Sequence, residues 1–368
     1  DAAPDMMVVE CADPFAGGEL VEVLDFASGD HPTFHQSLGQ GWDGRLYFDL
    51  RQVDEDALLT PTEQFFVRTF YPDPLDPDRA GEWTIEIDGL VDAPLSLAVA
   101  DLAPRDMGAF VLECSGNGDF SQFGLLSAAT WQGVPLAEVL ADVGVLPEAT
   151  AVKISGFDEH DVPSRNGHST PGAAWIIPLD QLAATGAFLA TGMNGGPLPP
   201  DHGLPVRLYV PNWYGCACIK WVDTITFVDA DEPPTGQMVE FATRTHQPRP
   251  APALARDFLP PSMDQAAMPV RIERWQVDGE TLFRVVGIAW GGYAVTDALE
   301  IRFNPDEAWQ PVDVCPPMRA NQPWTVWEHL WQPAGPGLYQ VRCRVADDAV
   351  PTQRLDVGFY DRVVRVGG

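Results

Sequence analysis

Residues 193–207 read MNGGPLPPDHGLPVR, and residues 211–221 read PNWYGCACIKW. Together the two stretches enclose a short strand-like segment with a glycine-containing loop on either side. His202, Arg207 and Lys220 stand around this segment, and such side chains, together with loop N–H groups, can bind a phosphate. Taken singly, each of them is explained equally well as a scattered surface charge or, for His202, as a buried core histidine. Only the set of three predicts a binding site.

The overall charge makes this small basic group conspicuous. The chain has 368 residues, with 22 Lys and Arg against 53 Asp and Glu, which gives a formal charge of -31. Lys153 and Lys220 are the only lysines. A surface this negative repels phosphate backbones, so the composition argues against a nucleic-acid-binding protein. The acidic residues are scattered, which favours a solvated acidic surface over a docking face for a basic electron-transfer partner.

Hydrophobic residues make up 45% of the chain, which is enough to bury a core in each of two or three domains. No stretch approaches the roughly 18 to 20 consecutive apolar residues of a membrane-spanning helix, so we expect no membrane span. The sequence starts at Asp1 without a basic and apolar leader, so we expect that an export signal has been removed or is absent.

The first two thirds of the chain predict an α+β fold. Residues 1–55 show no strong period and predict an irregular extension, whereas residues 56–230 mix strands with short helices. Strand-like segments cover 83–87, 95–97, 109–113, 152–154 and 205–210. A short helical segment begins near Ala98, and residues 134–140 also have helical spacing.

The last third predicts a second domain of a different kind. Residues 231–268 are rich in Pro, Ala and Gln and predict a linker that wraps around the protein. Residues 269–368 show strands and turns at roughly ten-residue spacing, which is typical of an immunoglobulin-like β-sandwich. Its expected strands are 270–275, 281–287, 299–304, 326–331 and 338–345.

The six cysteines, at positions 11, 114, 216, 218, 315 and 343, are too few and too irregular for a disulfide framework. Cys315 and Cys343 lie in strand-like segments and either pair or are small buried hydrophobes, and we favour the second interpretation. Cys216 and Cys218 lack the second pair that a tetrahedral zinc site would require.

Residues 113–118, ECSGNG, place a thiol at the end of an apolar strand, followed by small residues that leave room for a bulky group. Cys114 is therefore an inert cysteine in a tight turn, a nucleophile or a ligand of a soft metal. A nucleophile would need a histidine base, and the spacing of the seven histidines selects none. The inert cysteine and the metal ligand remain open.

Taken together, these segments resemble the sulfite oxidase family of molybdenum enzymes, over roughly residues 60 to 365. The similarity to the family's C-terminal sandwich includes a G-x-A-W-x-G motif with a tryptophan beyond it. The matching stretches are 62–68 (aromatic-x-R-N-H), 113–117 (C-[AS]-G-N), 193–207 (M-N-G-x-P-L-P-x-D-H-G-x-P-V-R), 214–221 (G-x-x-x-V-K-W) and 287–292 with Trp309.

The resemblance implies a molybdenum-molybdopterin cofactor in the α+β domain. Cys114 would be the protein thiolate on the metal, a soft ligand, and a catalytic residue together with Arg68. The β-sandwich of this family often mediates dimerisation, so a homodimer through that domain is implied. The residues implied to bind the cofactor are Phe66, Val67, Arg68, Thr69, Phe70, Asp158, His202, Arg207, Cys218, Ile219 and Lys220.

The chain departs from the family pattern around the substrate. The R-N-H motif ends here in Thr69 and Phe70, and an arginine that follows the cysteine loop is replaced by Asp119. Phe241, with Arg244 downstream, stands where the family has a pocket tyrosine. Exchanging an arginine for an aspartate removes a donor and adds repulsion toward an anion, so Asp119, Phe241 and Arg244 predict a weakly cationic pocket.

The resemblance implies oxygen-atom transfer coupled to two-electron redox, with oxidation of sulfite or a related sulfur oxyanion. The sequence has no C-x-x-C-H haem motif, so the electrons should pass to an external carrier such as a cytochrome. The alternatives are a reductase of S-oxides, N-oxides or nitrate, and, in another class, a cofactor-free binding subunit. Bacterial members are commonly exported after folding, so we expect a periplasmic or extracytoplasmic location.

Overall fold

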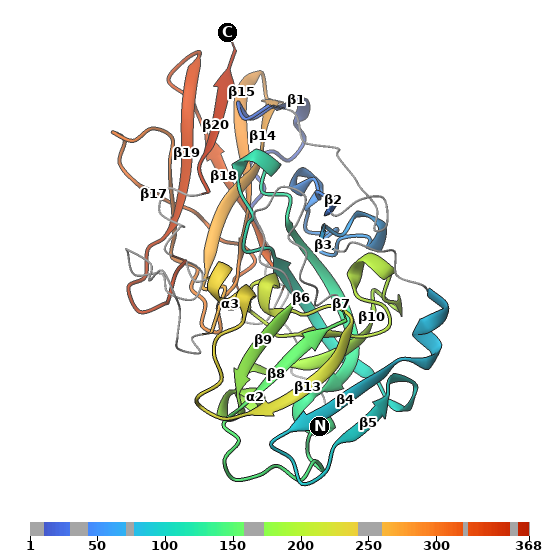
Figure 1. Cartoon of the computed structure of the whole chain (residues 1–368). Helices are drawn as coiled ribbons and strands as arrows, with labels where there is room; N and C mark the ends of the chain where they lie inside the picture. The colour runs from blue at the N-terminus through green and yellow to red at the C-terminus, as the bar shows by residue number, and fades with distance from the viewer. Residues whose placement is uncertain are drawn as a thin grey trace, which may run out of the picture.

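The structure is built mainly from β-strands, which form four larger sheets and one two-stranded ribbon (Figure 1). It is a computed structural model that describes residues 11–29, 43–70, 77–157, 173–241, 260–318, 323–353 and 360–367. None of the helices in these ranges is both long and apolar enough to cross a bilayer. Helices are short, so the mixed α/β prediction overestimated them: α1 (Leu136–Val139), α2 (Leu179–Thr185), α3 (Gly236–Glu240), and the 3-10 helices η1 (Leu50–Gln52), η2 (Thr62–Gln64), η3 (Pro77–Glu82), η4 (Val99–Asp101), η5 (Asp119–Ser121), η6 (Pro200–His202) and η7 (Gly215–Ala217).

One five-stranded sheet positions both the cysteine loop and Arg207. Its strand β6 ends at Glu113, directly before Cys114, and β12 begins at Arg207. The helix expected over 134–140 is wrong in its first two residues, because Val134 and Pro135 pair with β10 and continue a strand. The strands are β11 (Gly196–Pro197), β10 (Phe188–Met193), β7 (Leu126–Pro135) and β6 (Arg105–Glu113), with β12 (Arg207–Tyr209) paired to β10.

A second five-stranded sheet lies beside the first, at the lower end of the molecule in Figure 1. In β4 the apolar residues Ile85 and Ile87 alternate with more exposed residues, as expected for a strand with one buried face. The predictions of strands at 83–87, 95–97 and 152–154 are confirmed in this sheet. Its order is β5 (Leu95–Ala98), β4 (Thr84–Gly89), β13 (Val222–Val228), β8 (Ala151–Gly156) and β9 (Ala174–Pro178).

The last hundred residues form most of two four-stranded antiparallel sheets that pack around a common hydrophobic core. All five strands predicted there are present, whereas the immunoglobulin-like topology stays a prediction. One sheet has the order β1 (Glu19–Leu24), β14 (Ala266–Val277), β15 (Glu280–Trp290) and β18 (Thr325–Trp331). The other has the order β17 (Gln310–Pro311), β16 (Leu299–Arg302), β19 (Gly337–Val345) and β20 (Arg362–Val366).

The expectation of an irregular extension over residues 1–55 is wrong for two segments. Strand β1 pairs antiparallel with β14 and so completes a C-terminal sheet, and β2 (Asp43–Leu46) forms a ribbon with β3 (Val67–Phe70). Most residues of β1 are exposed, because it is an edge strand held by backbone pairing. Such a strand carries little periodic signal in its own sequence.

The sheet containing β14, β15 and β18 is buried on both faces. Val285 contributes to the core of the sandwich, whereas the neighbouring Val286 and Ile288 belong to the core of the α+β part. Side chains alternate between the two faces of a strand, so one sheet serves both cores. The C-terminal sheets therefore pack firmly against the part of the protein that carries the cysteine loop.

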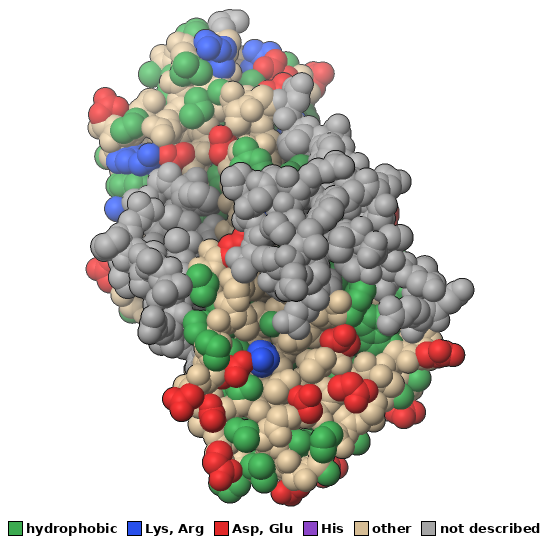
Figure 2. Space-filling view, viewed as in Figure 1, with side chains coloured by type: hydrophobic (Ala, Val, Ile, Leu, Met, Phe, Trp, Pro, Cys, Tyr) green, Lys and Arg blue, Asp and Glu red, His purple; other side chains and the backbone are tan. Residues whose placement is uncertain are grey.

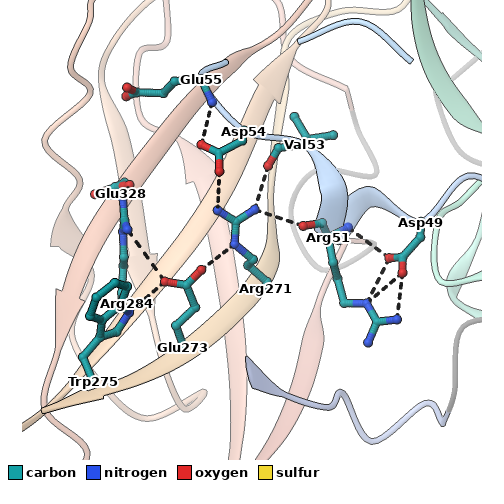
Figure 3. A network of polar contacts seen from close by, with 10 residues as sticks. All are labelled: Asp49, Arg51, Val53, Asp54, Glu55, Arg271, Glu273, Trp275, Arg284 and Glu328. Carbon is teal, nitrogen blue, oxygen red and sulfur yellow. Dashed lines mark hydrogen bonds and ion pairs between the residues drawn. The ribbon is translucent and has the colours of Figure 1, made fainter. Parts of the chain in front are cut away.

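A polar network adds to this contact (Figure 3). Arg271 on β14 is 8% exposed and donates hydrogen bonds to the carbonyl oxygens of Arg51 (3.0 Å) and Val53 (2.7 Å). Its Nε donates to Glu273 at 2.6 Å, and the other oxygen of that carboxylate accepts from Trp275 Nε1 at 2.8 Å. The network thus fixes the segment around η1 to the C-terminal sheet.

Cys11 and Cys315 form a disulfide, so the interpretation of Cys315 as a buried unpaired residue is wrong. Its partner is far away in the sequence, which is why spacing could not reveal it. Cys343 is 3% exposed within the sandwich core, as expected for a small buried hydrophobe.

Candidate active site

Cys114 opens a tight turn at the end of β6. Its N–H donates to the carbonyl oxygen of Leu125 at 2.9 Å, and its own carbonyl oxygen accepts from the N–H of Asn117 at 2.9 Å. The N–H of Gly116 lies 3.4 Å from the Cys114 Sγ. Cys114 is a free, half-buried cysteine, so its sulfur can meet a ligand from the surface of the turn.

The loop of residues 211–221 packs against this turn through Gly215. A Cβ atom at Gly215 would lie 3.3 Å from the carbonyl oxygen of Glu113 and 3.8 Å from the Cα of Cys114. Glycine therefore allows the loop to approach the cysteine backbone closely. Two of the motifs that the sequence singled out meet at this point.

His202, Arg207 and Lys220 lie together beside the ribbon of β2 and β3. Arg207 donates to the carbonyl oxygens of His202 (3.1 Å) and Cys218 (3.0 Å), and its backbone forms a bridge with that of Lys220. The ammonium group of Lys220 donates to the carbonyl oxygen of Asp201 and to the hydroxyl of Thr69. The structure thus brings the predicted basic set together with β3.

Burial shapes the charges of this group. It lowers the pKa of His202 well below its usual value, and the nearby charges of Lys220 and Arg207 lower it further. His202 is therefore neutral at pH 7. Burial also lowers the pKa of Arg207, because it disfavours the charged form of the guanidinium. An anion bound beside Arg207 would stabilise this charged form.

The residues present fit a cofactor that carries a phosphate. Arg207 is 2% exposed, and among the described residues its Nε has no hydrogen-bond partner. At Gly203, with a φ of +109°, a Cβ atom would lie 3.1 Å from the Cβ of Arg207 and 3.2 Å from that of Lys220. A glycine there keeps the space over both basic residues open, as a bulky ligand requires.

A pair of arginines forms a second charged feature, close to Cys114. Arg45 on β2 stands directly opposite Arg68 on β3, and both are half-buried. Burial lowers the pKa of Arg68 to about 10, and the charges of Cys114, Glu240 and Tyr47 oppose this shift. Burial and the charge of Arg68 lower the pKa of Arg45 to about 10 as well. Both stay protonated at neutral pH.

Arg45 and Tyr47, whose side chain hydrogen-bonds Arg45, are residues of the candidate site that the sequence motifs did not reveal. The prediction of a weakly cationic pocket did not take Arg45 into account. Both missed residues lie in or next to β2, where the sequence has no period and matches no motif. Only the pairing of β2 with β3 reveals that Arg45 belongs to the site.

The remaining predicted residues are placed as follows. Phe241 is half-buried at the end of α3, next to Glu240. Asp119 is exposed in η5. Burial lowers the pKa of Arg362 to about 10, and the nearby carboxylate of Asp119 opposes this shift. Phe66, Val67, Thr69, Cys218 and Ile219 are buried, Phe70 ends β3 without a described side chain, and Asp158 and Arg244 lie outside the described residues.

Comparison with known proteins shows what the part of the chain that carries this site is similar to. A family model described as an oxidoreductase molybdopterin binding domain matches residues 71–235. Mitochondrial sulfite oxidase of Macaca fascicularis is 28% identical over 378 aligned positions, covering 94% of this chain and 64% of that protein. A nitrate reductase (NADPH) of Aspergillus niger is 31% identical over 197 positions, covering 49% of this chain and 22% of that protein.

Among solved structures, the sulfane dehydrogenase SoxCD from Paracoccus pantotrophus has a similar fold, with a TM-score of 0.66 and 18% sequence identity. The match covers 96% of this chain and 88% of that one. The chain spans 58% of the length of the rat sulfite oxidase and 64% of the macaque protein.

Residues 71–235 are thus a molybdopterin-binding oxidoreductase domain, which carries the basic cluster and the cysteine loop. Over most of its length the chain is similar to sulfite oxidases, molybdenum-dependent oxidoreductases of the sulfite oxidase family.

Proposed function

We propose that this protein oxidises a small sulfur oxyanion, sulfite or a close relative, at a molybdenum cofactor held by Cys114. The observation that carries the proposal is the pair of Arg45 and Arg68 near that cysteine. Two like charges side by side repel each other, and an anion bound between them removes the repulsion and accepts charge-assisted hydrogen bonds. The pair therefore favours an anionic substrate.

Each group of the chain then has a distinct role. Cys114 supplies the thiolate ligand, while His202, Arg207 and Lys220 bind the pterin and its phosphate. Arg45 and Arg68 orient the substrate anion, and the hydrogen bond from Arg45 to Tyr47 restricts where its guanidinium lies. The bound molybdenum cofactor supplies oxygen-atom transfer and two-electron redox.

Nitrate reduction is the second candidate, because nitrate reductases are among the relatives and nitrate is also an anion. A neutral S-oxide or N-oxide would gain less from two arginines, so those substrates fit this pocket less well. The electron carrier is proposed to be external, such as a cytochrome, and a homodimer through the C-terminal sheets remains a prediction.

Three measurements on the purified chain test the function. Elemental analysis should find about one molybdenum per chain. Sulfite should reduce the enzyme and support steady turnover with ferricyanide, whereas reduced viologen with nitrate should support none. Turnover only in the second assay would favour the nitrate candidate. Absence of molybdenum after expression in a host that makes the cofactor would support the cofactor-free binding subunit.

Replacing Arg45 by Met should raise the KM for sulfite about 10- to 100-fold, because hydrogen bonds to a charged group contribute about 1.5–3 kcal/mol. Steady-state kinetics at constant ionic strength measure this effect. Arg45→Lys keeps the charge without the planar fork and should recover part of the loss. Arg51→Met, which removes an arginine held by Asp49 in the same part of the chain, should leave the KM unchanged. Equal KM values for Arg45→Met and Arg51→Met would refute this role.

We also propose a periplasmic or extracytoplasmic location, supported by the disulfide between Cys11 and Cys315, since such bonds persist in oxidising compartments. Denatured protein purified without reductant should show four thiols by Ellman titration, out of six cysteines in the chain. After treatment with a reductant the number should rise to six. Six thiols before reduction would contradict the proposal.

A further inference from the structure

Glu113 is a buried carboxylate directly before Cys114, the cysteine proposed to hold the metal. Its exposed fraction is 0%, so both oxygens must find donors inside the protein. Oε1 accepts from the hydroxyl of Tyr360 at 2.7 Å and lies 3.4 Å from Asn117 Nδ2. Oε2 accepts from Trp290 Nε1 at 3.0 Å. Three donors thus surround one side chain of the cysteine loop.

Two of these donors come from the C-terminal part of the chain, 177 and 247 residues away. Trp290 ends β15, and Tyr360 precedes β20. Their rings touch edge to face with centroids 5.1 Å apart, and both residues are at most 2% exposed. The two side chains therefore form a packed wall behind the loop, and they belong to the region of the sandwich sheets.

The third donor closes the loop itself. Asn117 contacts Glu113 through its amide nitrogen, and its side-chain oxygen accepts from the N–H of Leu125 at 3.1 Å. The backbone N–H of Asn117 donates to Cys114. The turn that carries the thiol is thus fixed at both ends, by Glu113 before the cysteine and by Asn117 after it.

A second path leads from the wall to the other side of the cysteine. The amide oxygen of Gln353 lies 2.8 Å from the Tyr360 hydroxyl and 2.6 Å from that of Tyr214. Tyr214 directly precedes Gly215, which lies against the backbone of Cys114. The C-terminal region therefore contacts both the turn that carries Cys114 and the loop of residues 211–221 that packs against this turn.

We infer that Glu113 is a positioning residue, through which Trp290 and Tyr360 of the C-terminal region hold the Cys114 turn in place. The carboxylate suits this role because it accepts from all three donors and brings no donor of its own. The inference rests on Cys114 being the metal ligand, since a fixed turn then fixes the orientation of the thiolate toward the metal.

Substitutions in the wall test the inference without touching the loop. Trp290→Phe and Tyr360→Phe each remove one donor and keep an aromatic ring in place. In the full-length holoenzyme, we expect amide hydrogen exchange of a peptide covering residues 113–118 to rise about tenfold, because a hydrogen bond to a charged group is lost. The electron paramagnetic resonance spectrum of the molybdenum(V) state should change as well.

Trp275→Phe is the matched control. It also removes an indole N–H donor to a buried carboxylate, Glu273, in the same C-terminal sheet, away from the cysteine loop. Its effect on global stability should resemble that of Trp290→Phe, while exchange at 113–118 and the spectrum stay unchanged. Unchanged loop exchange and an unchanged spectrum in both wall variants would overturn the inference. Tyr360→Phe, which loses only one oxygen atom, decides the matter if Trp290→Phe does not fold.

The exchange measurement also separates this inference from the proposed function. A chain that takes up no molybdenum would refute the function, yet exchange at residues 113–118 in the same protein would still show whether Trp290 and Tyr360 hold the turn.

Discussion

Cys114→Ser should lower turnover with sulfite more than about 100-fold, while the protein still folds and binds the pterin. Removing a residue that only supports a metal ligand typically costs 10- to 100-fold, so loss of the ligand itself should cost more. A serine hydroxyl is a harder donor than a thiolate and is not ionised at neutral pH. Steady-state kinetics, with the pterin released by denaturation measured in parallel, check this expectation.

The side chains proposed to bind the pterin explain why the cofactor should remain. His202, Arg207 and Lys220 lie on other segments of the chain and keep their contacts in the variant. Cys343→Ser is the matched control, since it changes a buried cysteine of the sandwich core far from the site in sequence. That variant should lose stability and keep its turnover. Full activity in Cys114→Ser would eliminate the metal-ligand role.

Arg271→Met should destabilise the protein by about 3–5 kcal/mol, the usual cost of breaking a buried ion pair. The substitution leaves Glu273 without its closest cation and removes the donor to the carbonyl oxygens of Arg51 and Val53 (Figure 3). The free energy of unfolding from urea titration of the full chain measures the effect.

Arg274→Met, at a position three residues further along β14, provides the comparison. Arg274 pairs with Glu22 on β1, and the two side chains are 31% and 45% exposed. Partly exposed pairs of this kind contribute about 0–1 kcal/mol, so this variant should remain close to the native stability. Similar losses in both variants would show that the buried network does not contribute as proposed. Replacing Arg271 and Glu273 together by apolar residues should recover much of the loss.

The sequence predicted which basic side chains lie together, because each motif is a continuous string with fixed spacing. The stretch 113–118 locates the thiol, and residues 193–221 locate the three basic side chains that meet beside β3. In the same way, local alternation predicted the strands of the sandwich. The acidic residues are scattered in the sequence, and Figure 2 likewise shows them spread over the visible face.

What the sequence could not show depends on contacts between distant segments. Arg45 joins the candidate site because β2 pairs with β3, and the sequence of neither strand identifies its partner. Glu113 looks like the polar end of a strand until Trp290 and Tyr360 are seen to reach it. The pairing of Cys11 with Cys315 is hidden for the same reason. Long-range pairing is set by the tertiary packing as a whole, not by local propensity.

The place of β1 in a C-terminal sheet constrains how the protein can be made. Glu19–Leu24 leaves the ribosome long before β14, so its partner does not yet exist while most of the chain is being synthesised. The nascent chain therefore cannot finish folding from its N-terminus onward, and β1 must stay unpaired until β14 has been synthesised. The sheet that packs against the core of the α+β part is complete only after β14, β15 and β18 have been synthesised.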